Sequence, residues 1–122
     1  MTKELTIERS DLFKKEFKKL IKKYKNLEKD LGTFVNAQLS MFHIHEMDNG
    51  GIVQIPLTKI HNPLFFKARK FRSRDFPKSG VQSGFRIIYA FHPKEIRVEL
   101  IEIYHKSNKP NHDEKRIKSH GT

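Results

Sequence analysis

The spacing of apolar residues changes once along the chain, from a helical to an extended period, and this change constrains the fold most. In the first 45 residues apolar side chains recur mostly at steps of three and four, as on one face of a helix. The two stripes are Phe13, Phe17, Leu20, Ile21 and Tyr24, then Leu27, Leu31, Phe34, Val35, Leu39 and Phe42. From Phe85 to Phe91 every second residue is apolar, as on a strand. Helices followed by strands predict an α+β fold.

Cap and turn residues set the expected bounds of these elements. Ser10 or Asp11 can cap one helix and Asn26 a second, because their side chains accept hydrogen bonds from a first helical turn. We expect the two helices to form a hairpin on one face of a small twisted antiparallel sheet. The expected elements are a strand over 4–9, helices over 11–25 and 27–45, a loop with room for a short strand over 48–63, a sheet over 64–104 and a tail over 105–122 with a short C-terminal helix.

The last two strands are expected to form a hairpin at the centre of the sheet. A turn over 92–95 separates the strand that begins at Phe85 from the strand that begins at Ile96. The apolar alternation of the second strand shifts phase between Leu100 and Ile101, which indicates a bulge or burial on both faces. A chain of 122 residues with these elements is expected to be a single domain, over 1–122.

The charge of the chain points to a polyanionic partner. There are 25 Lys and Arg against 14 Asp and Glu, a formal net charge of +11. Such an excess adds self-repulsion, so RNA, DNA, a ribosome or an acidic protein is favoured over a basic protein without such a partner. Six lysines on the far face of the first helix, over 14–23, are more typical of a solvated surface than of a phosphate-binding ridge.

Several classes of function are excluded or disfavoured. The chain has no cysteine, which excludes disulfides, a thiolate nucleophile and a cysteine zinc site. His43 and His45 alone do not define a metal site, so we expect no metal. No signal peptide begins the sequence and no apolar run is long enough to span a bilayer, so we expect a cytoplasmic protein.

Basic and aromatic residues alternate in the segment 65–78. Cations neutralise phosphates and aromatic rings stack on unpaired bases, so this composition is typical of RNA binding. If the segment 65–72 is a strand, Lys67 and Arg69 share one of its faces. The cations are Lys67, Arg69, Lys70, Arg72, Arg74 and Lys78.

Two further groups of residues are candidates for chemistry. Arg86 points away from its apolar neighbours on its strand and can stabilise charge on a phosphate, unless it pairs with Glu99 or Glu102. Cutting RNA by transesterification also needs a base for the 2′-OH and an acid for the leaving oxygen. The available side chains past the last strand are Tyr104, His105, Lys106 and His112. A histidine near a surface is more often inert than catalytic.

Five features follow one another along the chain. They are an opening strand, two helices with a lysine-rich face, Lys67-x-Arg69, the strand Gly84-Phe85-Arg86-Ile87-Ile88-Tyr89, and Ile101-x-Ile103-Tyr104-x-Lys106. In this order they resemble the RelE/ParE toxin superfamily over most of the chain. The resemblance implies two N-terminal helices on a twisted antiparallel sheet.

For function, the resemblance implies the toxin of a type II toxin–antitoxin system. RelE-like members cleave mRNA in the ribosomal A site through attack of the 2′-OH on the adjacent phosphate, with no metal or small-molecule cofactor, and a cognate antitoxin blocks them. The catalytic residues implied are Lys67, Arg69, Arg86, Lys106 and His112. The RNA-binding residues expected around them are Lys70, Arg72, Arg74, Lys78, Tyr104 and His105. The segment from Arg72 to Gly84 is longer and more basic than in the prototype, and Ser107 stands where some members have arginine.

Two other functions stay open at this point. ParE-like members inhibit DNA gyrase and lack the dense set of basic residues found here, so the nuclease branch is favoured. A non-catalytic basic RNA-binding module would keep the charge but would be indifferent to the loss of Arg86. The sequence also leaves open which of Tyr104, His105 and His112 transfers the proton.

Overall fold

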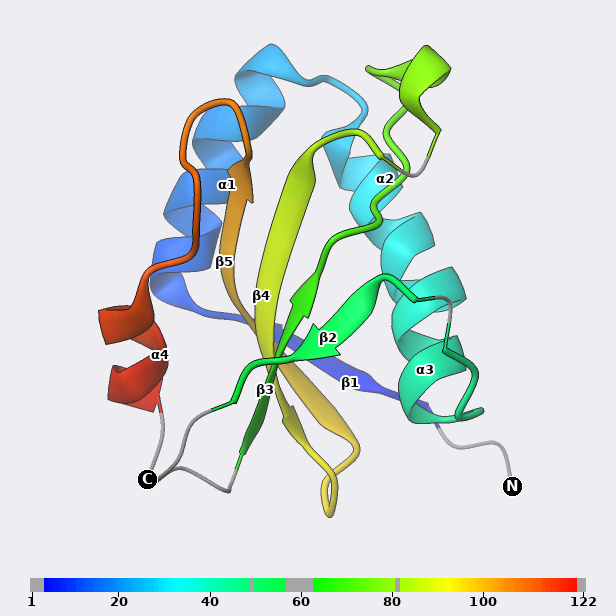
Figure 1. Cartoon of the computed structure of the whole chain (residues 1–122), viewed down its shortest axis with the longest axis vertical. Helices are drawn as coiled ribbons and strands as arrows, with labels where there is room; N and C mark the ends of the chain where they lie inside the picture. Colours follow the sequence, from blue (N-terminus) through cyan, green and yellow to red (C-terminus); the bar gives the residue numbers. More distant parts are fainter. Residues whose placement is uncertain (1–3, 49, 57–62, 81, 121–122) are drawn as a thin grey trace.

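The computed structural model describes residues 4–48, 50–56, 63–80 and 82–120, and these form an α+β fold with one five-stranded mixed sheet (Figure 1). The strands are β1 (Thr6–Arg9), β2 (Ile52–Gln54), β3 (Leu64–Ala68), β4 (Phe85–His92) and β5 (Arg97–His105). The α-helices are α1 (Asp11–Lys23), α2 (Leu27–Phe34), α3 (Ser40–His43) and α4 (Glu114–His120), with a π-helical segment Val35–Leu39 between α2 and α3 and a 3₁₀ turn Pro77–Ser79.

The strand order is β1-β5-β4-β3-β2, so the hairpin of β4 and β5 is central, as predicted. The prediction of a wholly antiparallel sheet is wrong at β1, which pairs in parallel with β5. A tight turn would force an antiparallel pair, but the helices and three strands separate β1 from β5 along the chain. That long connection lets β1 enter the edge of the sheet in the same direction as β5.

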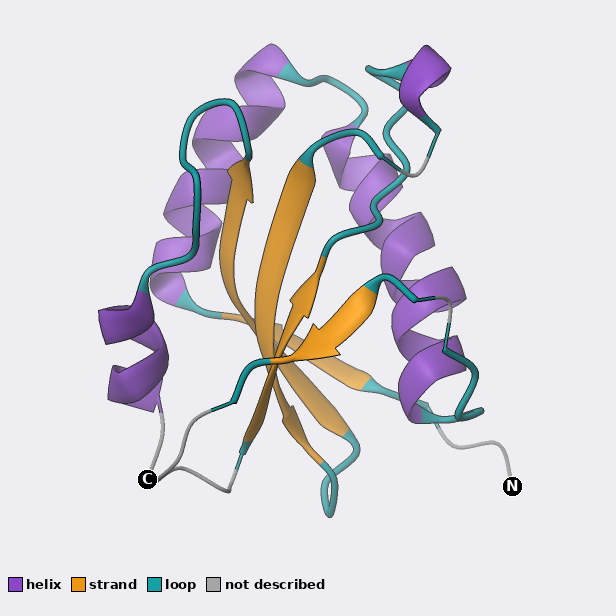
Figure 2. Cartoon of the chain, in the orientation of Figure 1, coloured by secondary structure: helices purple, strands orange, loops and turns teal. Residues whose placement is uncertain are grey.

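The helices at the N-terminal end cover one face of the sheet (Figure 2). The predicted stripes supply this core, which includes Phe13, Phe17, Leu27 and Leu31, and it packs on alternate residues of β4. The first helix ends at Lys23, two residues before the predicted end, and the second continues from α2 through the π-helical segment to His43. In the described part of the chain, no helix is long and apolar enough to cross a membrane.

The other face of the sheet has its own apolar cluster, over which α4 packs. The cluster consists of Ile55, Phe65, Ile88, Ala90, Ile101, Tyr104 and Ile117. Ile88 pairs with Glu102 and Tyr89 pairs with Leu100, so the predicted bulge in β5 is present. It turns Leu100 toward the helices and Ile101 toward the outer cluster, which buries both.

The strand expected over 65–72 ends earlier, at Ala68. Phe71 is completely buried among the helices, against Phe34 and Phe85. A regular strand would put Lys70 on that face and Phe71 on the other, so the chain leaves the strand and restores the burial of the phenylalanine. The expected loop 48–63 contains the short strand β2, and residues 57–62 lie outside the described part.

Replacing Ser10 with alanine is expected to lower the free energy of unfolding by about 1 kcal/mol. The Ser10 Oγ accepts from the Phe13 amide at 3.2 Å and caps α1, and it lies 3.2 Å from the carbonyl oxygen of Ile101. Urea denaturation measures the loss. Thr33→Ala is the matched control, because its hydroxyl donates within its own helical turn, to the Lys29 carbonyl at 3.2 Å. Equal losses in both variants would contradict the capping role.

Candidate functional site

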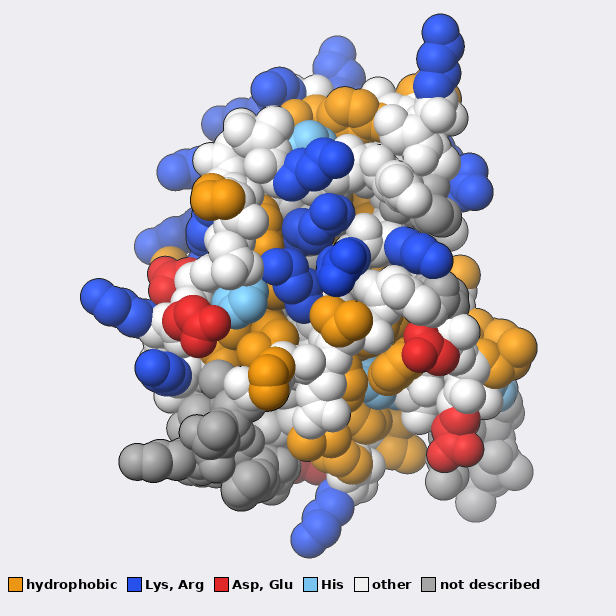
Figure 3. Space-filling view, in the orientation of Figure 1, with side chains coloured by type: hydrophobic (Ala, Val, Ile, Leu, Met, Phe, Trp, Pro, Cys, Tyr) orange, Lys and Arg blue, Asp and Glu red, His pale blue; other side chains and the backbone are white. Residues whose placement is uncertain are grey.

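Four cationic side chains converge on one cleft of about 180 Å³ on the outer side of the sheet. Arg69 and Lys70 follow β3, Arg86 lies on β4, and Lys106 comes directly after β5. The remaining lining residues are Gly50, Gly51 and Gln82. Figure 3 shows the blue side chains gathered in the middle of this face. No carboxylate lines the cleft among the described residues, so it is suited to an anion.

Arg86 faces outward, as predicted, because its neighbours Phe85 and Ile87 point toward the helices. Its Nη1 donates to the carbonyl oxygen of Arg69 at 3.1 Å and to that of Phe85 at 3.3 Å. Within the described chain no ion pair joins Arg86 to a carboxylate, so the alternative pairing with Glu99 or Glu102 is not formed. The guanidinium is therefore oriented by backbone carbonyls and keeps its positive charge directed at the cleft.

Lys67 lies beside this cluster, one residue before the end of β3. Its Nζ donates to the Oδ1 of Asn111 at 2.9 Å and lies 5.9 Å from the centre of the Tyr104 ring. Burial lowers the pKa of Lys67, the positive charges of Arg86 and Arg69 lower it further, and only Glu102 opposes them. A larger fraction of this amine is thus neutral near physiological pH than of an ordinary lysine, which favours a role in proton transfer.

A close approach of two chain segments shapes the wall of the cleft. The Arg69 amide donates to the Gly51 carbonyl at 2.7 Å, which holds the segment after β3 against the start of β2. A Cβ added at Gly51 would lie 2.7 Å from the Cβ of Lys70. Any larger residue at position 51 would therefore displace Lys70, so Gly51 has a packing role at the cleft.

His105, which was predicted to bind RNA, is buried at 8% exposure. Its Nε2 donates to the Ser83 carbonyl at 2.8 Å, which leaves Nδ1 to accept from Ser107. The ring stacks on Phe76 with centroids 5.3 Å apart. Both nitrogens serve the protein, so this histidine is a structural residue.

Tyr104, also predicted to bind RNA, is buried in the outer apolar cluster and exposes little of its side chain. Its hydroxyl has no hydrogen-bond partner among the described residues. Burial raises the pKa of Tyr104, Glu102 raises it further, and Arg86 partly offsets this. A phenol with a raised pKa stays protonated near neutral pH, so Tyr104 is unsuited to act as the base.

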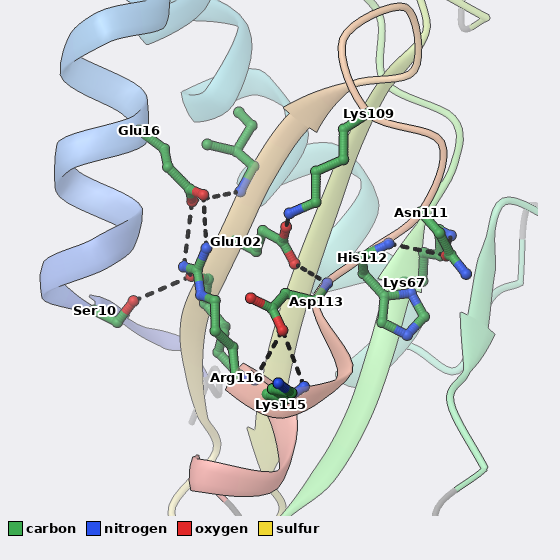
Figure 4. Close-up of polar contacts among 12 residues, drawn as sticks. Ser10, Glu16, Lys67, Glu102, Lys109, Asn111, His112, Asp113, Lys115 and Arg116 are labelled. Atoms are coloured by element: carbon green, nitrogen blue, oxygen red, sulfur yellow. Dashed lines mark hydrogen bonds and ion pairs between the residues drawn. The ribbon is translucent and has the colours of Figure 1, made fainter.

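His112 lies next to the Lys67–Asn111 contact, since its backbone amide donates to the same Asn111 Oδ1 at 2.9 Å (Figure 4). Its Nε2 is 3.2 Å from a carboxylate oxygen of Glu114, and its side chain is 9% exposed. The Nδ1 atom is buried without a hydrogen-bond partner in the described part of the chain. His112 therefore stays beside the site but outside the residues that line the cleft.

The remaining predicted RNA-binding residues lie on the segment between β3 and β4. Arg72 and Lys78 are exposed, and Lys78 belongs to the 3₁₀ turn. Arg74 is bound to the buried Asp30 at 2.7 Å, so it also anchors this segment to α2. None of the three lines the cleft. Sequence reasoning did not single out Gln82 or Asn111, because no local pattern marks an amide that acts across long sequence separations.

His43 packs among aromatic residues of the core that faces the helices. Its Nε2 is 2.7 Å from the Tyr89 hydroxyl, and its ring stacks on Phe91 with centroids 4.0 Å apart. Burial lowers the pKa of His43 to about 4, so the neutral ring accepts a hydrogen bond from the tyrosine hydroxyl. In residues 4–48, 50–56, 63–80 and 82–120, no group of three His, Asp or Glu side chains is arranged to hold a metal ion.

Comparisons with protein-family models, with curated proteins and with solved structures found no match to this chain.

Proposed function

We propose that the chain is a metal-independent endoribonuclease, the toxin of a type II toxin–antitoxin system that cleaves mRNA on the ribosome. One observation carries the proposal: Arg69, Lys70, Arg86 and Lys106 meet at one cleft, next to a lysine whose pKa is lowered. A pentacoordinate phosphate carries more negative charge than the RNA from which it forms, so fixed cations stabilise the transition state most.

The reaction assigned to this cleft is transesterification within the RNA chain. Lys67, in its neutral form, takes the proton from the 2′-OH, and the 2′-oxygen forms a bond to the adjacent phosphorus. Arg86 and Arg69 stabilise the charge on the non-bridging oxygens. The bond from phosphorus to the 5′-oxygen breaks, and Lys106, which lines the cleft, protonates that oxygen. The products are a 2′,3′-cyclic phosphate and a 5′-hydroxyl end. The reaction consumes no water and involves no oxidation or reduction.

Binding of the RNA strand on either side of the cleft is assigned to the exposed cations nearby. Arg72 and Lys78 supply charge for phosphates that are not being cut, and Arg74 adds to it from the exposed part of its side chain. The RelE-like helical hairpin, the ribosomal A site, a cognate antitoxin and a cytoplasmic location belong to the same proposal. They rest on the resemblance described above.

The deciding experiment induces the wild-type chain and Arg86→Ala in a bacterium, then maps mRNA 5′ ends and follows growth and translation. We expect cleavage within translated reading frames and growth arrest for the wild type, and neither for Arg86→Ala. Lys94→Ala is the matched control, since it also removes one cation but lies in the exposed turn at the other end of β4.

Other results would favour the two alternative functions. Growth arrest with intact mRNA and disturbed DNA supercoiling would support the gyrase inhibitor. Normal growth with all three proteins, together with RNA binding that survives Arg86→Ala, would support a non-catalytic binding module. Lack of cleavage by the wild type in cells that translate normally would end the nuclease proposal.

A further inference from the structure

A buried carboxylate fixes the segment that joins β5 to α4. Glu102 is completely buried on the outer face of the sheet. One of its oxygens pairs with the Lys109 Nζ and the other accepts from the Asp113 amide at 2.9 Å. The two contacts hold both ends of the stretch 109–113 on one side chain (Figure 4). A buried carboxylate with both oxygens bound is a strong restraint, because an unpaired one is very costly.

The helix that follows holds the same stretch from its other end. The carboxylate of Asp113 accepts from the Lys115 amide at 3.0 Å and thereby caps α4. Arg116 of α4 pairs with Glu16 of α1 at 2.6 Å, and Ile117 is completely buried in the outer cluster. Residues 109–113 thus lie between two anchored elements and have little freedom to move.

Asn111 lies in the middle of this fixed stretch and reaches back to the sheet. Its Oδ1 accepts from the Lys67 Nζ at 2.9 Å and from the His112 amide at 2.9 Å. The second contact sets the direction of the Asn111 amide, and the first holds the lysine. The side chain of Asn111 thereby links Lys67 to the segment that Glu102 anchors, across 44 residues of sequence.

The chemical nature of the acceptor matters as much as its position. Three charged groups act on the charge of Lys67: Arg86 and Arg69 oppose it, and Glu102 favours it. The ring of Tyr104 lies 5.9 Å from the Lys67 Nζ, and Lys109 lies over the same ring. The backbone amide of His112 shares the Asn111 acceptor with Lys67. A carboxylate at position 111 would add a full negative charge at hydrogen-bond distance and hold the proton on the lysine. An amide oxygen fixes the amine without adding that charge.

We propose that Asn111 is a positioning residue that holds the amino group of Lys67 at the edge of the cleft through a neutral acceptor. The role of Lys67 in proton transfer rests on the proposed function, whereas the contact itself does not. Asn111 acts through Lys67 and is not assigned a contact with the RNA. Asn111 thereby affects the charge state of Lys67 and restricts the motion of its side chain.

The test compares Asn111→Asp and Asn111→Ala with the wild type, by NMR titration of protein with isotope-labelled lysine, in which Lys67→Arg identifies the signal. We expect Asn111→Asp to raise the titration midpoint of Lys67 by about one pH unit, and Asn111→Ala to leave the side chain more mobile. Asn108→Asp is the control, because it adds the same charge in the exposed turn before this stretch. It should shift the midpoint far less.

A second readout links the contact to the proposed reaction. A cleavage assay on programmed ribosomes gives the pH–rate profile of each variant. The rising part of this profile should shift to higher pH in Asn111→Asp and stay in place in Asn108→Asp. If the titration of Lys67 shifts but the wild type cuts no RNA, the positioning role stands and the proposed function fails. An unchanged titration and mobility of Lys67 in both Asn111 variants overturns the inference, whatever happens to the RNA.

Discussion

Gly84→Ala is expected to lower the free energy of unfolding by about 3 kcal/mol, the largest stability effect that we expect from a single methyl group in this protein. Gly84 has φ +97°, a conformation that residues with a side chain rarely adopt. An added Cβ would also lie 2.6 Å from the Nε2 of His105. The imidazole cannot move away without losing its contacts with Ser83 and Ser107.

The two causes have separate magnitudes. Backbone strain at a positive φ costs about 1–2 kcal/mol, and each lost hydrogen bond of the buried imidazole adds about 1 kcal/mol. Thermal and urea denaturation measure the sum, and the melting temperature should fall by about 10 °C or more. Gly80→Ala is the matched control, because Gly80 has φ +58° but an added Cβ would meet nothing within 4 Å. If both variants lose the same free energy, the contact with His105 contributes nothing.

The glycine before β4 has a structural cause. The glycine of Gly84-Phe85-Arg86 is required by the approach of His105, which is packed on the side of the sheet that faces the helices. Continuing the alternation of β5 from Ile103 by two residues places His105 on that face. The signal that His105 is structural was therefore present in the sequence.

Local periodicity predicted the parts of the fold that depend on neighbours in sequence. The apolar stripes of the helices, the two faces of β4 and the bulge after Leu100 all follow from spacing along one element. The parallel pairing of β1 with β5 does not follow from spacing, because the sequence of a four-residue edge strand does not indicate which strand it pairs with. The early end of β3 depends on the tertiary burial of Phe71.

The candidate site also has features that the sequence predicts and features that depend on the tertiary fold. Arg86 was placed correctly on the outer face, because its two neighbours are large and apolar. The meeting of Arg69, Lys70 and Lys106 with Arg86 depends on how β2, β3 and β5 are arranged in the sheet. The contact of Lys67 with Asn111 depends on a segment 44 residues away that Glu102 holds in place. Such long-range contacts have no signature in a single sequence.

For the RNA cleavage that we propose, Arg86→Ala is expected to slow the reaction by about a hundredfold, and Arg86→Lys by about tenfold. Arginine presents several donors in a fixed plane, and Nη1 already binds the carbonyls of Arg69 and Phe85. That anchoring directs the rest of the guanidinium toward a phosphate in the cleft. Lysine keeps the charge but replaces a planar fork with a single flexible point of contact, so it cannot restore both the anchoring and the bidentate contact.

The measurement is the single-turnover rate of cleavage on ribosomes programmed with a defined mRNA, with the free energy of unfolding of each variant measured beside it. Loss of the two carbonyl contacts is expected to lower stability by only about 1–2 kcal/mol, so the variants stay folded and differences in rate reflect the chemical step. Lys94→Ala should cut at the wild-type rate. A wild-type rate in Arg86→Lys would mean that charge alone matters. A wild-type rate in Arg86→Ala would remove Arg86 from the site and leave the cleft with a role in binding alone.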